Sequence, residues 1–528
     1  MFDNAGRMYF LLAGILAVFA LYINLDMLPL IGDEAIRAVV ALEMMISGDY
    51  ITPTLNGEIY LNKPPLFNWI LIGFFKIFRN NSEFFVRLPT TLFLIGYCFT
   101  IYYWIGKKLG KPIGILSSLL FLTCGRTLFW DSFLGLIDIF FSWLVFTNFM
   151  LIWHYYEKRN YLHLFFFSYL ITAICFLLKG VPSLAFQGIT LLVIFIDGKR
   201  FKTLLSWRHF AGIFTFLLIC GTYYLFYYLR NPQYLDDALL RLVTESSQKS
   251  AIGAGIAQTA VHVLTFPFEV IYHFLPWTLL VVFIVNSAIF RKLITNRFIR
   301  YCILIFTANI IVYWLSPITY PRYLLMLIPL AFIVFLYAAR LHALQKTRMY
   351  RIVTTGSRYL IIAMACAIVL LPVIFADYLP VNHLYIKVAA LAIVTLIIFK
   401  ITLYSKIRSG FIYIIVLLLL AGRIGFDLFI FPYRQSESWI SLCRSDAIKL
   451  AKATSGEELY VMADTITMHN VYYLTRERND IIRYNHNPVS GPWFITNEIT
   501  DSLFSKEYTM RVPMNYSTFF AGKYKENP

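Results

Sequence analysis

Acidic and basic side chains interrupt an otherwise apolar sequence, and their types are those that acid–base chemistry and phosphate binding require. Asp33, Glu34 and Arg37 lie in the stretch GDEAIRA, and Lys63 precedes two prolines in LNKPPLFNWI. A carboxylate can orient or deprotonate a hydroxyl group, whereas lysine and arginine can hold a phosphate. Arg37 follows the acids by three or four residues, so a helix would place all three on one side. A surface salt bridge is the simpler explanation of this set.

Lys63 stands before Pro64, Pro65 and the apolar run 66–78, which is too short to span a bilayer. Such a run is typical of an interfacial or re-entrant helix. Proline suits the start of a helix, where its missing N–H group costs nothing, and it holds the preceding residue in extended geometry. Lys63 is therefore predicted near the lipid headgroups. There it could bind a lipid phosphate or simply reach the interface.

Three more charged residues fall at the ends of apolar segments. Asp138 begins one segment in GLIDIFF, and a carboxylate so placed is costly unless it is paired or used. A helix cap or a buried salt bridge is the alternative. Lys179 in LLKG and Arg322 in YPRY are candidate phosphate ligands. Both are also typical of cations that anchor helix ends at the headgroups.

Metal and thiol chemistry find little support in the sequence. His262, Glu269 and His273 share one connection but lack metal-ligand spacing. The seven cysteines are scattered, and no CxxC pattern occurs. We therefore predict no metal site, no disulfide and no cofactor, while a divalent ion remains an open alternative.

The elements that must position these residues are membrane-spanning helices. Hydrophobic residues make up 59% of the 528 positions, charged residues 14%, and the mean hydropathy is +0.67. A spanning helix needs roughly 20 apolar residues, because its backbone polar groups must pair within the segment. The fold class predicted is a polytopic α-helical membrane protein of about thirteen spans. They lie near 8–28, 84–106, 112–130, 136–156, 161–178, 181–197, 210–229, 274–290, 300–316, 323–339, 359–376, 383–401 and 411–431.

Charge placement predicts the orientation of these spans. The net charge is +17, and its lysines and arginines concentrate in alternate connections. That alternation is the positive-inside rule, so it argues against nucleic acid as a partner. It places the N-terminus in the cytoplasm. The long connections 29–83 and 230–273 and the tail then face outward, on the same side as the candidate site residues.

Two of these outward segments are predicted to fold. The connection 230–273 reads as two short helices around SAIGAG, and we expect it to cover a substrate. The tail 432–528 reads as a small external α/β domain that follows a transmembrane domain of residues 1–431. Its expected helices are WISLCRSDAIKLAK and MHNVYYLTRE, and its expected strands are 458–464, DIIRYN and PWFIT.

The chain also resembles a known family. GDEAIRA, SGDYITPTLNGEIYLNKPPLFNWI, SEFFVRLPT, LLKGVPSLAFQG, FLPWTLL and YPRYLLMLIPL are similar to motifs of GT-C class membrane glycosyltransferases. The resemblance is closest to the lipid A aminoarabinose transferases and to bacterial members of the protein O-mannosyltransferase superfamily. It covers most of residues 1–340. The connection 230–273 departs most clearly from the aminoarabinose enzymes, which puts the acceptor in doubt.

The resemblance implies transfer of a sugar from a polyprenyl-phosphate carrier to an acceptor on the outer face of the bacterial cytoplasmic membrane. Asp33 matches the family's acidic residue in the first external loop, and Asp138 its second acidic position. Lys63 matches a lysine that stabilises the leaving phosphate. The residues expected to contact substrate are Glu34, Arg37, Lys63, Lys179 and Arg322.

Several alternatives stay open at this point. A transporter or flippase for a polyprenyl-linked lipid would also need a cationic outer cavity, but no internal repeat or broken midplane helix is evident. An oligosaccharide ligase would use the same carrier. The acceptor could be a lipid A-like glycolipid, another envelope glycan or a protein. A cytoplasmic nucleotide-sugar donor is disfavoured, because the candidate residues face outward.

Overall fold

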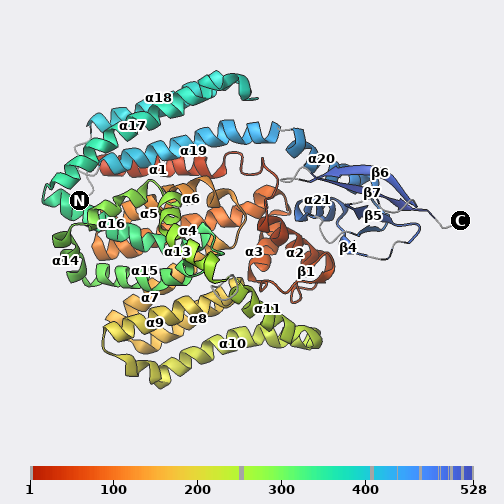
Figure 1. Cartoon of the computed structure of the whole chain (residues 1–528), viewed down its shortest axis with the longest axis horizontal. Coiled ribbons are helices and arrows are strands. Elements are labelled where there is room, and N and C mark those ends of the chain that lie inside the picture. The colour runs from red at the N-terminus through yellow and green to blue at the C-terminus, as the bar shows by residue number, and fades with distance from the viewer. Residues whose placement is uncertain are drawn as a thin grey trace.

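The structure is a computed structural model that describes residues 4–248, 255–404, 410–436, 438–462, 467–485, 487, 489–497, 499, 503–512 and 517–525. It consists of a large helical bundle and a smaller part built around a sheet at the C-terminal end (Figure 1). The protein is mostly helical, with several apolar spans and a small C-terminal sheet domain. This confirms the predicted fold class.

Within the described residues, six helices are each long and apolar enough to cross a membrane, and two bent pairs bring the number to eight. The six are α4 (Glu83–Leu109), α8 (Tyr161–Lys179), α10 (Trp207–Arg230), α15 (Arg297–Trp314), α17 (Arg348–Ile374) and α19 (Gly410–Ser436). Other bundle helices are α1 (Asn4–Tyr22), α5 (Lys111–Thr123), α6 (Gly125–Phe129), α7 (Asp138–Glu157), α9 (Pro182–Asp197), α14 (Ser287–Thr295), α16 (Ile328–Leu344) and α18 (Leu384–Tyr404). Short 3-10 helices complete the connections: η1 (Asp131–Phe133), η2 (Phe201–Leu205), η3 (Pro232–Tyr234), η4 (Trp277–Ile284), η5 (Pro321–Leu324) and η6 (Ala376–Tyr378).

The prediction of a single helix over 274–290 is wrong. That stretch holds η4, and α14 begins only at Ser287, because the Asn286 side chain accepts hydrogen bonds from the backbone N–H groups of Ala288 (3.0 Å) and Ile289 (3.1 Å). Asparagine at this position starts a new helix. In this region η4 forms a bent pair with the preceding helix, α13 (Ile256–His273), and the angle between the two is 115°.

The connection 29–83 folds as two helices around a hairpin. The helices are α2 (Asp33–Ser47) and α3 (Leu66–Phe78), and both were expected from the sequence. Between them β1 (Thr54–Leu55) and β2 (Glu58–Ile59) pair across an Asn-Gly turn whose φ angles are 53° and 76°. Both residues have the left-handed conformation that tight hairpin turns prefer. The hairpin thus carries the chain from the end of α2 to Lys63 and α3.

The connection 230–273 contains α11 (Leu235–Gln248) and α13, as expected. Of the glycine-containing stretch SAIGAG between them, only Gly255 lies within the described residues. These two helices lie at different places: α11 is next to the first outer connection, and α13 packs in the bundle (Figure 1).

The C-terminal part is a mixed α/β unit. Its helices are α20 (Ser438–Ala453) and α21 (Met468–Arg478), and its strands are β3 (Leu459–Val461), β4 (Arg483–Tyr484), β5 (Trp493–Thr496), β6 (Phe504–Arg511) and β7 (Thr518–Tyr524). The sheet order is β4-β3-β5-β7-β6, with β3 parallel to β4 and β5 and the β5–β7–β6 pairs antiparallel. The sequence analysis predicted the first three strands but missed β6 and β7. Positions 463–464 of the expected first strand lie outside the described residues, and the domain boundary at 431 stays a prediction.

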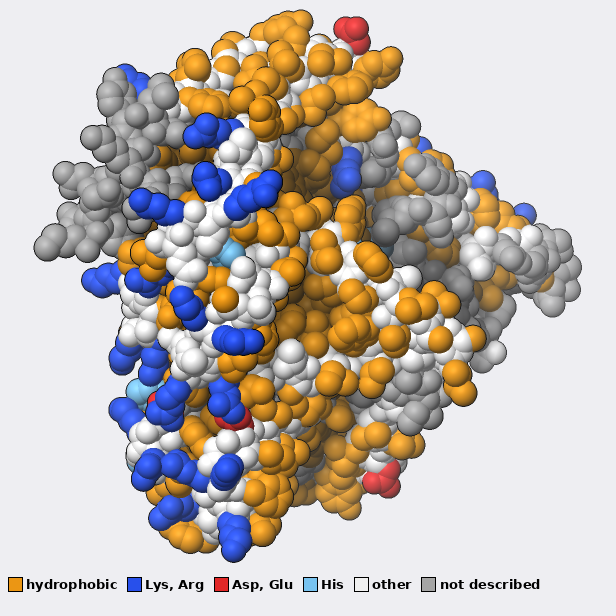
Figure 2. Space-filling model, turned by 60° about the vertical axis from the view of Figure 1, so that its left-hand side comes forward, with side chains coloured by type: hydrophobic (Ala, Val, Ile, Leu, Met, Phe, Trp, Pro, Cys, Tyr) orange, Lys and Arg blue, Asp and Glu red, His pale blue; other side chains and the backbone are white. Residues whose placement is uncertain are grey.

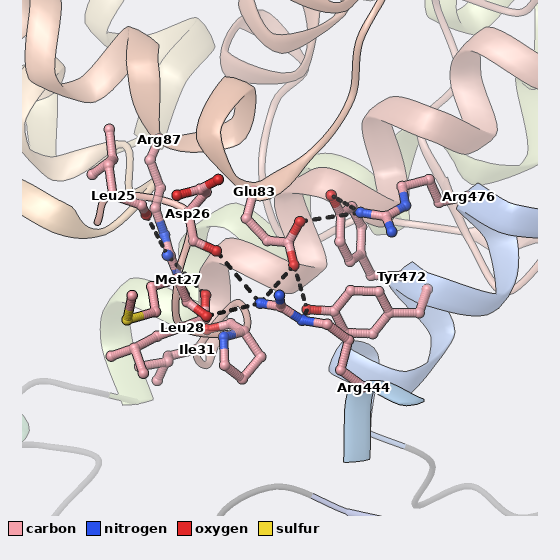
Figure 3. A network of polar contacts seen from close by, with 12 residues as sticks. Leu25, Asp26, Met27, Leu28, Ile31, Glu83, Arg87, Arg444, Tyr472 and Arg476 are labelled. Carbon is pink, nitrogen blue, oxygen red and sulfur yellow. Dashed lines mark hydrogen bonds and ion pairs between the residues drawn. The ribbon is translucent and has the colours of Figure 1, made fainter. Parts of the chain in front are cut away.

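Ion pairs fasten this unit to the first outer connection. Glu83, at the start of α4, accepts from Arg444 (2.9 Å), from Arg476 (3.1 Å) and from the Tyr473 hydroxyl (2.7 Å). Figure 3 shows these guanidinium groups converging on one carboxylate. The Tyr472 hydroxyl adds a bond to the backbone oxygen of Asn81 (2.5 Å). We call the end of the bundle where α2, α3 and α21 meet the site end, and the opposite end the basic end.

Candidate functional site

Four charged side chains form a chain of ion pairs at the site end. Arg322 lies between two carboxylates: its Nη2 is 2.9 Å from Asp33 Oδ2, and its Nε is 3.3 Å from Asp138 Oδ2. Lys179 Nζ is 2.5 Å from Asp138 Oδ1. These residues are up to 289 positions apart in the chain. The structure therefore brings together four of the seven residues that the sequence analysis singled out.

Helix ends hold the members of this cluster. Asp33 begins α2 and Asp138 begins α7, whereas Lys179 ends α8. Carboxylates at helix N-termini and a cation at a C-terminus are stabilised by the helix dipoles. Arg322 comes from η5, between α15 and α16. The charges meet because helices from distant parts of the chain all end at this level of the bundle.

Aromatic rings support the two cations. Lys179 Nζ lies 3.9 Å from the ring centroid of Tyr323, and the Arg322 guanidinium lies 4.5 Å from that of Tyr320. Cation–π contacts of this kind hold a cation in place without neutralising its charge. Burial disfavours the charged form of Arg322, but Asp138 and Asp33 outweigh it and raise its pKa. Arg322 thus stays charged while it faces the site.

A separate, fully buried network lies directly behind the cluster. Arg87 on α4 donates to both carboxylate oxygens of Glu34 (3.1 and 2.8 Å) and to the carbonyls of Leu25, Leu28 and Pro29 (2.8–3.0 Å). Glu34 is 0% exposed. Its carboxylate also accepts from the backbone N–H of Ile31 (2.5 Å). We interpret this network as a structural support that fixes the position of the segment immediately before α2.

The same network sets the spacing between the two acidic positions of the site. Glu34 Oε2 accepts a hydrogen bond from the backbone N–H of Gly135 (2.8 Å), three residues before Asp138. One carboxylate therefore ties the start of α2 to the segment that leads into α7. Asp33 and Asp138 are held on either side of Arg322 by a scaffold that takes no part in the cluster itself.

Glu34, which was expected to contact substrate, lies in this buried network, and that expected contact stays a prediction. Its neighbour Asp33 is 55% exposed and faces the cluster, whereas Glu34 points inward at its partners in the buried network. Arg37 is also absent from the acidic pair: its Nη2 donates to the Tyr60 hydroxyl at 2.8 Å. All three residues lie in the first turns of α2, as expected, but each has a different partner.

Lys63 has a partner that the sequence analysis did not name. Its ammonium group pairs with the Glu245 carboxylate of α11, and both side chains are partly exposed. Lys63 lies within electrostatic range of Asp138. Burial raises the pKa of the Tyr60 phenol; Arg37 opposes this, while Glu245 and Asp33 add to it. The charged groups of α11, the hairpin segment and the cluster therefore interact electrostatically.

The other candidates in the 230–273 connection lie elsewhere. The His262 ring nitrogen Nε2 is 3.2 Å from the Tyr313 carbonyl, and Glu269 accepts from Thr265 one turn along α13. Across the described part of the chain, no group of three His, Cys, Asp or Glu residues is placed to hold a metal ion. These residues have local partners in α13 and its neighbours.

A surface pocket of about 690 Å³ lies beside the Lys63–Glu245 pair. The hairpin contributes Glu58 and Asn62, α11 contributes Asp237 and Arg241, and the C-terminal part contributes Tyr484. Arg241 Nε donates to Asn62 Oδ1 (2.8 Å), so the hairpin and α11 are also joined here. No sequence pattern predicted this pocket, because its lining comes from three separate segments.

Comparisons with known proteins agree with this architecture. A sequence profile of the family described as dolichyl-phosphate-mannose-protein mannosyltransferase matches residues 62–225, a stretch that contains Lys63, Asp138 and Lys179. An uncharacterized protein of Aquifex aeolicus is 25% identical over 212 residues, which cover 40% of this chain and 41% of that relative. The chain thus aligns with about two fifths of that relative's length.

Solved structures give a match over nearly the whole chain. ArnT from Cupriavidus metallidurans bound to undecaprenyl phosphate superposes with a TM-score of 0.69 at 16% identity, covering 98% of both chains. Its apo state gives a TM-score of 0.68 at 18% identity, also with 98% coverage of both. The protein is a multi-pass membrane protein with the fold of the GT-C class of membrane glycosyltransferases.

Proposed function

We propose that this protein transfers a sugar from a polyprenyl-phosphate-linked donor to an acceptor on the outer face of the cytoplasmic membrane. The observation that carries the proposal is the Asp33–Arg322–Asp138–Lys179 cluster, with Lys63 nearby. It combines a partly exposed carboxylate with several cations at one end of a membrane bundle. A glycosyl transfer from a lipid phosphate needs both.

The donor phosphate is proposed to bind at Lys63 and to replace Glu245 as its partner. In the structure Glu245 supplies a carboxylate to the Lys63 ammonium, which is the kind of contact a phosphate oxygen would make. With Glu245 withdrawn, the group of cations that includes Lys63, Lys179 and Arg322 would lose one competing carboxylate. The donor phosphodiester brings one negative charge, and the polyprenyl phosphate that leaves is a monoester carrying roughly −1.5 to −2 near pH 7, so fixed cations favour the product charge.

Asp33 is proposed to act on the acceptor. Its carboxylate takes the proton of the acceptor hydroxyl while the acceptor oxygen forms a bond to the anomeric carbon. The bond between the anomeric carbon and the phosphate oxygen breaks, and polyprenyl phosphate leaves with the bonding electrons. Fixed cations stabilise the developing charge more in the transition state than in the ground state.

Asp138 is proposed to keep those cations in place. It contacts both Lys179 Nζ (2.5 Å) and Arg322 Nε (3.3 Å). Its carboxylate orients two cations of different geometry, a point charge and a planar fork. Glu34 is reassigned in this proposal from substrate contact to support, because the buried network already uses its oxygens.

The acceptor and the orientation complete the proposal. We place the site end outside, with the N-terminus in the cytoplasm, because lysine and arginine concentrate at the other end. The acceptor is then an envelope glycolipid such as a lipid A-like molecule, another glycan, or a protein. The fold likeness to ArnT bound to undecaprenyl phosphate supports a polyprenyl-phosphate carrier, and so does the family profile over residues 62–225.

The test is transfer of radiolabelled sugar from a defined polyprenyl-phosphate sugar to an envelope extract by the purified protein. We expect label on an acceptor with the wild type, and loss of that label with Asp33→Asn and with Lys63→Ala. Lys76→Ala is the matched control, because Lys76 is an exposed lysine on α3 that contacts Tyr50 at 2.7 Å and lies outside the cluster.

Two results would redirect the proposal. An intact donor with every acceptor, together with movement of the lipid across vesicles, would favour a transporter. Transfer of a whole oligosaccharide in place of one sugar would favour a ligase. Wild-type activity in both site variants would remove the residue assignments while leaving the fold assignment untouched.

A further inference from the structure

A second charged pocket lies at the basic end, far from the site described above. It has a volume of about 330 Å³ and lies between the ends of α7, α9 and α15. Asp138 begins α7 and Glu157 ends it, and the helix has 20 residues. At about 1.5 Å per residue this separates the two ends by roughly 30 Å. The pocket is therefore on the opposite side of the membrane bundle from Asp33.

Arginines dominate the rim of this pocket. Arg159, Arg200, Arg297 and Arg300 line it, against two acids, Glu157 and Asp197. Figure 2 shows that lysine and arginine side chains gather along one side of the molecule, next to broad apolar faces. A rim of four guanidinium groups with two carboxylates leaves an excess of positive charge at the mouth.

The acids hold only part of that charge. Arg297 Nη2 is 2.8 Å from Glu157 Oε1, and Arg300 pairs with Asp197. Arg200 donates instead to the neutral Tyr161 hydroxyl at 2.6 Å. Guanidinium groups offer planar forks of donors that match phosphate oxygens. A phosphate entering the rim would meet arginine donors that the two carboxylates do not neutralise.

The floor of the pocket is apolar. Val193 and Ile194 of α9 and Leu304 and Ile305 of α15 line it beneath the arginines. Trp153 of α7 also lines it and is 7% exposed. Its aromatic ring adds to this apolar lining.

We propose that this pocket binds an anionic phospholipid of the leaflet that the basic end faces. The phosphodiester lies among the arginines, and one acyl chain follows the apolar floor. An amphiphilic ligand fits the combination of cationic rim and apolar floor better than a small anion does. The site is distinct from the proposed donor site, and its lipid would brace α7, α9 and α15 against one another.

The test measures lipid retention and thermal unfolding of the full-length protein purified in neutral detergent. The probes are phosphatidylglycerol, phosphatidylcholine and inorganic phosphate, added separately. We expect phosphatidylglycerol to raise the unfolding midpoint and to be retained in native mass spectra. Phosphatidylcholine and inorganic phosphate should do neither. Equal stabilisation by inorganic phosphate would overturn the lipid assignment, and no difference between the two lipids would overturn the site.

Variants of opposite charge sign localise the effect. Arg297→Ala combined with Arg300→Ala should weaken phosphatidylglycerol binding by roughly fivefold for each arginine. Glu157→Gln combined with Asp197→Asn should strengthen it, since it frees the same two arginines. Arg291→Ala is the matched control, because Arg291 is exposed on α14 and does not line the pocket. Identical lipid binding in all three proteins would contradict the proposal.

This outcome is independent of the proposed transferase activity. The double variants leave every residue of the site end unchanged, so failure of lipid binding says nothing against sugar transfer. Conversely, an inactive wild type that still selects phosphatidylglycerol through these arginines would support the pocket alone.

Discussion

Asp33 and Glu34 are neighbours in the chain, yet they belong to two regions with opposite character. Glu34 is fully buried, and its two carboxylate oxygens accept from Arg87, Ile31 and Gly135. Asp33 is half exposed and pairs with Arg322, which it shares with Asp138. One region is closed and saturated with hydrogen bonds. The other is open, and its charges are held by partners that a substrate could share or replace.

This difference shows that the surroundings of an acidic residue, and not its type, decide its role. A buried pair whose donors and acceptors are all satisfied contributes specificity of structure, and removing one partner leaves an uncompensated charge. An open pair contributes little to stability but keeps its charge available for chemistry. The two regions should therefore respond to substitution in opposite ways.

Removal of Arg87 should give the largest effect on folding. Arg87→Ala leaves the Glu34 carboxylate buried and unpaired, and it frees three carbonyls of the preceding segment. We expect the free energy of unfolding to fall by about 3–5 kcal/mol, measured by thermal or denaturant unfolding in detergent. Arg208→Ala, on the exposed start of α10, is the control and should change it by less than about 0.5 kcal/mol. Equal effects of the two would remove the distinction between the regions.

Arg322 should show the opposite balance. Arg322→Ala takes the shared partner from Asp33 and Asp138, so the rate of sugar transfer should fall by about 10²–10³-fold. Stability should fall less than in Arg87→Ala, because the ion pair to Asp33 is open to solvent and Asp138 keeps Lys179 as a partner. Arg322→Lys keeps the positive charge but lacks the planar guanidinium with its several fixed donors, so it should recover only part of the rate. A loss of folding that matches the loss of transfer would place Arg322 with the buried network.

The Lys63–Glu245 pair offers a smaller and more specific test. Glu245→Gln removes the carboxylate that we propose the donor phosphate replaces. Donor affinity should then rise by roughly fivefold, since the competing ion pair is worth about 1 kcal/mol at a partly exposed site. The KM for the polyprenyl-phosphate sugar measures this, and Glu58→Gln on the exposed hairpin is the control. A higher KM in Glu245→Gln would show that Glu245 helps to bind the donor.

A pH effect should be the smallest of these changes. His469 of α21 accepts from the backbone N–H of Gly32 (3.1 Å), directly before Asp33. Burial lowers the pKa of His469, and Glu34 only partly offsets this. Between the folded value and the unfolded value of about 6.5, the unfolded chain binds more protons. The stability from the neutral ring is therefore complete above about pH 6.5 and is lost as pH falls toward the folded pKa.

Unfolding midpoints between pH 8 and pH 5 check this prediction. The wild type should lose stability over that range, and His469→Gln should lose less, because glutamine does not titrate. An identical pH dependence in both proteins would exclude His469 as the group responsible.

Local patterns predicted much of the fold, and they failed where charges or a helix cap interrupt the hydropathy pattern. The apolar run after Pro65 predicted α3, and the helical periodicity of the tail predicted α20 and α21. The strands β6 and β7, which pair as neighbours in the sequence, were missed because FSKEYTMR carries charges at several positions. The break at Asn286 was missed because hydropathy alone does not register a helix cap.

The candidate site divides in the same way. Residue type and family resemblance singled out Asp33, Asp138, Lys179 and Arg322, which the structure places together. No sequence signal could assign Glu34 to Arg87 and Gly135, because these contacts join segments 53 and 101 positions apart. Glu245 was missed for the same reason: it lies 182 positions from Lys63. Which charges are buried is decided by packing.

The most direct measurement compares Asp33→Asn with Glu34→Gln in one assay of sugar transfer per folded molecule and one of thermal unfolding. Each variant replaces a carboxylate by its amide at adjacent positions, so size and chemistry are matched. We predict that Asp33→Asn folds normally and loses about 10²–10⁴-fold in transfer rate, while Glu34→Gln unfolds at a lower temperature and retains activity in its folded fraction. Normal transfer by folded Asp33→Asn, or an inactive but stable Glu34→Gln, would contradict the account.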